Sequence, residues 1–119
     1  PVHHGDIPAL AWRIEIDGQS IVITGSFNNS KNLAATFAKD ADALVVSHAI
    51  PENSRGVLRD LYARPSQLGR VANQADARMM ILGHRNVRTR GRESLSRNAI
   101  EENYDGTILF ANDGECWGL

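Results

Sequence analysis

Four histidines and one serine lie where hydrophobic runs of the sequence begin or end. His3 and His4 precede the first run, Ser26 follows the second, and His48 and His84 follow the third and fourth. Side chains at the carboxyl ends of parallel strands share one edge of a sheet, which is where ligands bind. Because neutral imidazole is a good ligand for zinc, iron or manganese, these histidines are candidate metal ligands.

The spacing of these residues leaves a second interpretation open. Neither H-x-H nor C-x-x-C occurs in the chain, and such patterns are what identify a metal site from sequence. His48 can equally be a structural residue that hydrogen-bonds a loop carbonyl. His3 and His4 can equally be residues of a free terminus.

A run of basic residues follows His84. It contains the arginines Arg85, Arg88, Arg90, Arg92 and Arg97. Guanidinium groups bind phosphate and carboxylate groups through paired hydrogen bonds, so Arg85 and Arg88 are candidate contacts for an anionic substrate or a nucleotide phosphate. No aromatic residue is interleaved with them, as base stacking would require. A solvated loop is the alternative.

Ser26 lies in the segment TGSFNNS. The G-x-S-x-G elbow is absent from this segment, and so is the second glycine of a Walker phosphate loop. Asn28, Asn29 and Ser30 are typical of turns and helix caps. The sequence therefore argues against a serine hydrolase at this place.

Hydrophobic patterning predicts the strands that would position these residues. Residues 10–16 and 20–24 alternate as two strands around a hairpin turn at Asp17 and Gly18. Residues 43–46, 79–82 and 107–111 are apolar runs of the kind found in strands covered on both faces.

Helices are predicted between these strands. Residues 30–38 form a short helix with Ser30 as its N-cap, residues 55–62 a helical turn, and residues 65–75 and 93–103 two longer helices. The predicted inward faces carry Leu33, Ala34, Phe37 and Ala38 in the first helix and Leu95, Ala99 and Ile100 in the last. Helices that alternate with buried strands are typical of an α/β fold. No linker or repeat divides the chain, so residues 1–119 are predicted to form a single domain.

Composition bounds the class of protein. Hydrophobic residues make up 42% and charged residues 23% of the chain, as in an ordinary globular domain. The net charge of −1 argues against nucleic acid or an acidic membrane surface as a partner, and no run approaches the ~20 apolar residues of a membrane span. Cys116, the lone cysteine, cannot form an internal disulfide, which suits the cytoplasm. Because the chain begins with Pro1, we expect a processed product or a fragment.

Taken in order, four stretches resemble the C-terminal half of metallo-β-lactamase-fold hydrolases of the ribonuclease Z-like and arylsulfatase-like type. They are HHGDIPALAWRIEIDGQSIVITG, DADALVVSHAIPE, YARPSQLGRVANQADARMMILGHR and YDGTILFANDGE, and they cover nearly the whole chain. The resemblance implies half of an αββα sandwich, with one mixed sheet and helices on one of its faces. In the complete fold a second sheet stacks on the other face, and metal ions sit at the sheet edges.

The resemblance also implies ligands, residue by residue. A histidine shortly before the first strand corresponds to His4, with His3 as the neighbouring alternative. The histidine that ends the strand before the last helix corresponds to His84, and His48 lies where relatives commonly carry His or Glu. The aspartate that bridges two metals in the family is replaced here by Ser26, whose hydroxyl cannot supply the bridging charge.

Two further departures define what this chain can do alone. Tyr62 stands where relatives often place a histidine in H-x-x-P-x-x-x-G, and the H-x-H-x-D-H motif of the N-terminal half is absent. The resemblance implies, for the complete protein, hydrolysis of a small-molecule ester, lactam, phosphodiester or sulfate with zinc or another divalent metal; the chain alone is expected to be inactive.

An uncovered apolar sheet face is costly, so we expect it to be covered by a missing N-terminal half or by a second copy in a homo-oligomer. The alternative to a hydrolase is a degenerate, non-catalytic binding or assembly module of the same fold.

Overall fold

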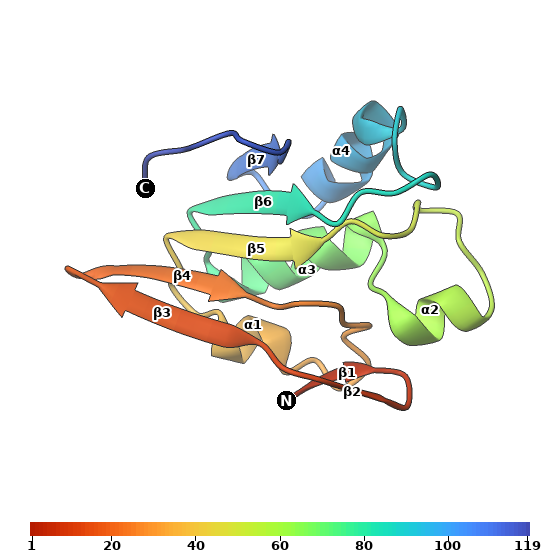
Figure 1. Cartoon of the computed structure of the whole chain (residues 1–119), viewed down its shortest axis with the longest axis horizontal. Helices are drawn as coiled ribbons and strands as arrows, with labels where there is room; N and C mark the ends of the chain where they lie inside the picture. Colours follow the sequence, from red (N-terminus) through yellow and green to blue (C-terminus); the bar gives the residue numbers. More distant parts are fainter.

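Five strands form one mixed sheet in the computed structural model, which describes all residues 1–119 (Figure 1). The strands lie in the order β3 (Trp12–Ile16), β4 (Gln19–Ile23), β5 (Ala43–Ser47), β6 (Met79–Gly83) and β7 (Thr107–Phe110). β3 and β4 form an antiparallel hairpin, whereas β4 to β7 are parallel. The α/β fold with a mixed sheet, and the strands predicted from the hydrophobic pattern, are confirmed.

Helices connect the parallel strands and cover one face of the sheet. They are α1 (Ala34–Phe37), α2 (Val57–Leu61), α3 (Pro65–Ala75) and α4 (Glu93–Glu101). α1 and α3 lie behind the strands in the view of Figure 1, and α2 lies beside the carboxyl ends of the strands. None of the helices has the length and apolar character needed to cross a membrane.

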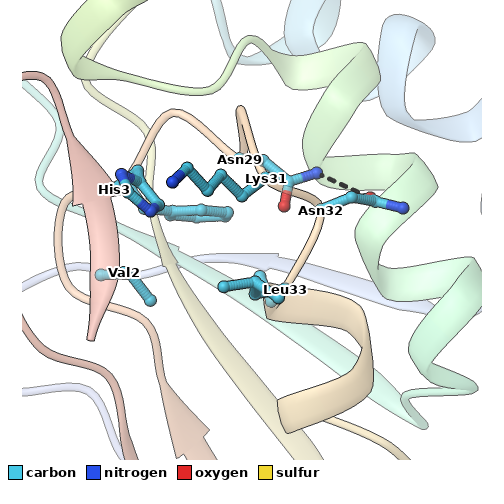
Figure 2. Close-up of a pocket in the computed structure, with 8 residues that line it drawn as sticks. Val2, His3, Asn29, Lys31, Asn32 and Leu33 are labelled. Carbon is cyan, nitrogen blue, oxygen red and sulfur yellow. Dashed lines mark hydrogen bonds between the residues drawn. The ribbon is translucent and has the colours of Figure 1, made fainter.

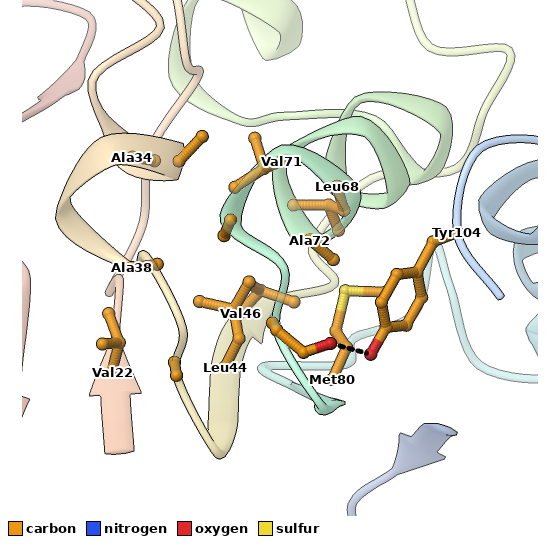
Figure 3. Close-up of a cluster of buried hydrophobic side chains, with 14 of the residues drawn as sticks. Val22, Ala34, Ala38, Leu44, Val46, Leu68, Val71, Ala72, Met80 and Tyr104 are labelled. Carbon is orange, nitrogen blue, oxygen red and sulfur yellow. Dashed lines mark hydrogen bonds between the residues drawn. The ribbon is translucent and has the colours of Figure 1, made fainter. Parts of the chain in front are cut away.

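The hydrophobic core lies between the sheet and the helices (Figure 3). Alternate residues of the strands, among them Val22, Leu44, Val46, Met80 and Leu82, point into it and meet the inner faces of α1 and α3. α3 and α4 pack closely at Gly69, where a Cβ atom would lie 2.6 Å from the carbonyl oxygen of Ile100. The buried hydroxyl of Tyr104 donates a hydrogen bond to the carbonyl oxygen of Ala77 at 2.9 Å.

The opposite face of the sheet is apolar and carries no helix. The strand register places on it ten apolar residues, Trp12, Ile14, Ile16, Ile21, Ile23, Ala43, Val45, Met79, Ile81 and Leu109, and also the polar residues Gln19, Ser47 and Thr107. We call the ten apolar residues the open face. Trp12 is 62% exposed and Ile16 is 63% exposed, so the open face is most exposed to solvent along the edge strand β3. The C-terminal residue Leu119 reaches this face: its carbonyl oxygen accepts a hydrogen bond from Gln19 Nε2 at 3.2 Å, and it lines a hollow together with Ile14, Ile16 and Ile21.

Two details of the helices differ from the predictions. α1 begins at Ala34 without a side-chain cap, so Ser30 is not its N-cap, and both Leu33 and Phe37 are exposed. In α4 the predicted inward residue Leu95 is 67% exposed, and its neighbour Ser96 is buried instead. Ser96 faces inward, where its hydroxyl hydrogen-bonds the buried His48, the residue directly after β5.

A small hairpin that the sequence did not predict precedes the sheet. β1 (Val2–His4) pairs with β2 (Ile7–Ala9) around Gly5, whose φ of +58° is readily adopted by glycine. The amide of Asn28 donates to the carbonyl oxygen of His3 at 2.7 Å. The N-terminal histidines are therefore held beside the loop that follows β4.

Candidate functional site

The carboxyl ends of β4, β5 and β6 bring Ser26, His48 and His84 to one edge of the sheet, as predicted from their places in the sequence. A hydrogen bond connects two of the segments at this edge. Gly25 turns the chain with a φ of +61°, and its carbonyl oxygen accepts a hydrogen bond from Ser47 Oγ at 3.0 Å. The loop that carries Ser26 is thus fixed to the end of β5.

His4 is buried and has one ring nitrogen committed to the protein. Its Nδ1 donates to the carbonyl oxygen of Leu61 at 2.6 Å, which places the proton on Nδ1 and leaves the lone pair on Nε2. This arrangement is the one usually found for histidines that bind metals, because the backbone carbonyl fixes both the tautomer and the ring orientation.

Tyr62 contacts both His4 and His84. Its ring centroid is 5.0 Å from that of His4 and 6.0 Å from that of His84, and both contacts are edge-on. Tyr62 directly follows α2, the helix whose last carbonyl anchors His4. His84 is exposed, with a φ of +55°. The structure therefore brings His4, Tyr62 and His84 into one group. We call His4 and His84 the histidine pair.

His3 points away from this group, because successive residues of a strand face opposite sides. Figure 2 shows its side chain beside Lys31 and near Asn29, over the loop that leads to α1. The cavity there has a volume of about 10 Å³, which is too small for a ligand. His3 as an alternative ligand remains a prediction, but the geometry favours His4.

His48 lies on the helix side of the sheet and is fully buried. Its Nε2 is 2.7 Å from Ser96 Oγ, its ring packs against Phe110, and its Nδ1 has no hydrogen-bond partner. Burial, assisted by the positive charge of Arg85, lowers the pKa of His48 to about 4, against a smaller opposite effect of Glu93. His48 is therefore neutral at pH 7. Its contacts are those of a packing residue, which leaves its assignment as a ligand a prediction without geometric support.

The donors of this chain do not make a complete metal site. Nowhere do three His, Cys, Asp or Glu side chains lie close enough together to hold an ion. The histidine pair supplies two imidazoles, whereas zinc sites in proteins have three or four protein ligands. Ser26, just after β4, offers a neutral hydroxyl and no carboxylate.

A polar cleft of about 590 Å³ lies beside His84, at the ends of β6 and β7. Two arginines line it, Arg85 and Arg90; Arg88, which was predicted with Arg85 as a contact for an anionic substrate, is not among the lining residues, and both assignments remain predictions. Arg85 is engaged with the protein itself, through Glu93 at 2.8 Å and the carbonyl oxygen of Ala111 at 2.5 Å. The spacing of arginines in a loop does not indicate which of them faces a cleft, and this is why Arg90 was not singled out.

Comparison with known proteins identifies the fold. No protein-family model and no curated protein matches the sequence. The structure is similar to the crystal structure of the metallo-β-lactamase fold protein YhfI from Bacillus subtilis, with a TM-score of 0.80 and 20% sequence identity. The match covers 98% of this chain and 46% of that chain. This chain thus has the architecture of about half of a metallo-β-lactamase fold, as the sequence resemblance implied.

Proposed function

We propose that this chain is the C-terminal portion of a metal-dependent hydrolase with the metallo-β-lactamase fold, of the ribonuclease Z-like or arylsulfatase-like type. One observation supports the proposal: His4 and His84 both contact Tyr62 beside the carboxyl ends of the strands, and the Leu61 carbonyl holds His4 by Nδ1, so that Nε2 is left for a metal. In this proposal the chain contributes two imidazoles to a site for zinc or another divalent metal.

The remaining ligands and the catalytic activity belong to the complete protein. Because two imidazoles do not make a hydrolytic centre, we assign no reaction step to this chain and expect it to be inactive alone. A small-molecule substrate is proposed for the complete protein. The unpaired Cys116 suits a reducing cytoplasm, which is the proposed compartment.

The open face is the proposed site of the missing partner. Sheets stack face to face about 10 Å apart through apolar side chains. The open face has a composition that suits such stacking, since ten apolar residues lie on this side of the sheet and Trp12 and Ile16 are largely exposed. A second sheet, from an N-terminal half or from a second copy of this chain, is the proposed cover.

Metal retention tests the proposal. The chain is loaded with zinc or manganese and desalted, and the bound metal is measured by elemental analysis. We expect retention of up to about one ion per chain, lost in His84→Ala and kept in His3→Ala. His84 and His3 make a matched pair, because neither side chain is fully buried and only His84 lies beside Tyr62. Equal retention in the wild type and in His84→Ala would contradict the assignment of His84.

A second candidate function is a degenerate, non-catalytic binding or assembly module. The neutral hydroxyl of Ser26 and the lack of any three-donor cluster favour it. Ser26→Asp separates the two candidates, because it restores a carboxylate at the end of β4. No retained metal in the wild type, with retention gained in Ser26→Asp, would favour a module descended from a metal site.

A further inference from the structure

The polar cleft beside His84 has the position of a ligand site. Its floor is formed by the ends of two parallel strands, at Gly83 and Ala111. In open α/β sheets ligands bind in crevices at this end of the strands. The seven residues that line the cleft include one hydrophobic residue and are Gly83, His84, Arg85, Arg90, Ala111, Asn112 and Asp113. Such a lining suits a polar ligand.

The loop that carries Arg90 is held in place by buried hydrogen bonds. Thr89 is fully buried, and its hydroxyl donates to the carbonyl oxygen of His48 at 2.9 Å. The side chain of Asn86 donates to the carbonyl oxygen of Ala49 at 3.0 Å. Because this backbone is ordered before a ligand arrives, less conformational entropy is lost on binding.

Of the two arginines that line the cleft, only Arg90 is free of an ion pair within the protein and can bind an anion. Arg85 is largely buried and its charge is compensated by Glu93, at 2.8 Å. Arg90 lines the cleft and is exposed, and no carboxylate lies within 4.0 Å of its guanidinium group. Asp113 is the only carboxylate of the lining, and it has no cationic partner either.

We propose that this cleft binds an oxyanion, a phosphate or carboxylate group, through Arg90. Asp113 repels a bare anion, so the matching ligand carries a hydroxyl or amine that donates to Asp113 while its anionic end meets Arg90. The cleft adjoins His84. On the proposed function, on which this further step rests, the hydrolase substrate is therefore a small phosphate or carboxylate that also bears a hydroxyl or amine.

The test uses the metal-free chain and two probes, inorganic phosphate and acetate. Each is titrated while amide shifts are followed by NMR, and a dispersed spectrum establishes that each variant is folded. We expect saturable shifts at Gly83 and Ala111. Arg90→Ala should weaken phosphate binding about tenfold, whereas Asp113→Asn should strengthen it. Tighter binding of phosphate than of acetate would assign the site to phosphate groups, and the reverse to carboxylates.

Arg88→Ala is the matched control. Arg88 is exposed on the same loop but does not line the cleft, so its removal changes the net charge equally and should leave phosphate affinity within about twofold. Equal weakening in Arg88→Ala and Arg90→Ala, or no saturable shift in the wild type, would overturn the proposal. Phosphate binding without metal retention would support the cleft and count against a metal site held by this chain's histidines, whereas metal retention without phosphate binding would support those histidines and overturn the cleft.

Discussion

The buried imidazole of His48 should make the stability of this protein fall in mild acid. The ordinary pKa of histidine is 6.5, and in the folded protein that of His48 is lowered to about 4. Between these values the unfolded chain binds a proton that the folded chain does not, so protons favour unfolding. The stabilising contribution is complete above pH 6.5 and is lost as the pH falls toward 4.

The size of the effect follows from the shift. A difference of about 2.5 pKa units corresponds to a loss of about 3 kcal/mol of unfolding free energy at its limit. At pH 5 the expected loss is about 2 kcal/mol, a large fraction of the stability of a small domain. Glu93 and Glu115, whose pKa values are lowered from 4.5 chiefly by hydrogen bonds, contribute in the same direction but mainly below pH 5, where the carboxyl groups of the unfolded chain bind protons.

Urea unfolding followed by circular dichroism between pH 7.5 and pH 5 measures this loss. His48→Gln should flatten the pH dependence, because it removes the group that titrates, whereas His3→Gln on the half-buried β1 strand should retain it. Should His48→Gln fail to fold, an NMR titration of the wild-type imidazole gives the pKa directly. Parallel pH profiles for the wild type and His48→Gln, or an imidazole pKa near 6.5, would refute the reasoning.

Two further predictions concern packing. Gly69→Ala should lower the unfolding free energy measured in urea by about 1–3 kcal/mol, because the added Cβ would lie 2.6 Å from the Ile100 carbonyl oxygen. Gly118→Ala is its control, because a Cβ at Gly118 would have nothing within 4 Å. Equal stability of the two variants would contradict the close contact of α3 with α4. Ile14→Lys, on the open face, should abolish self-association in sedimentation experiments and change the unfolding free energy by under about 0.5 kcal/mol. Val87→Lys, at an apolar residue that is 89% exposed away from the sheet, should leave self-association intact.

The order of strands and helices could be predicted because the pattern that produces it is local. Alternation in residues 10–16 and the apolar runs at 43–46 and 79–82 each specify a strand from a few neighbouring residues. The register then determines which face is apolar, so the open face was also foreseeable. The β1–β2 hairpin was not, because strands of three residues carry too little pattern to recognise.

The details that could not be predicted from the sequence depend on contacts between distant parts of the chain. Ser96, and not Leu95, faces inward because its partner is His48 on another element. Arg90 reaches the cleft because Thr89 is anchored to the backbone of His48. Likewise, Tyr62 could be noted in the sequence only as a replaced histidine, and its contacts with both His4 and His84 depend on the fold.

The open face and the incomplete ligand set are best understood together. Covering the open face with a second sheet would bury the exposed side chains of Trp12 and Ile16, each more than 60% exposed, and burial of apolar area is the main driving force of such association. The same sheet would bring further side chains to the edge where His4 and His84 lie. If the metal is shared between the two portions, its binding and their association are linked, and each strengthens the other by the same factor. Ile14→Lys, which contacts neither histidine, should therefore weaken metal retention only through the loss of association, and raising the concentration of the partner should restore it.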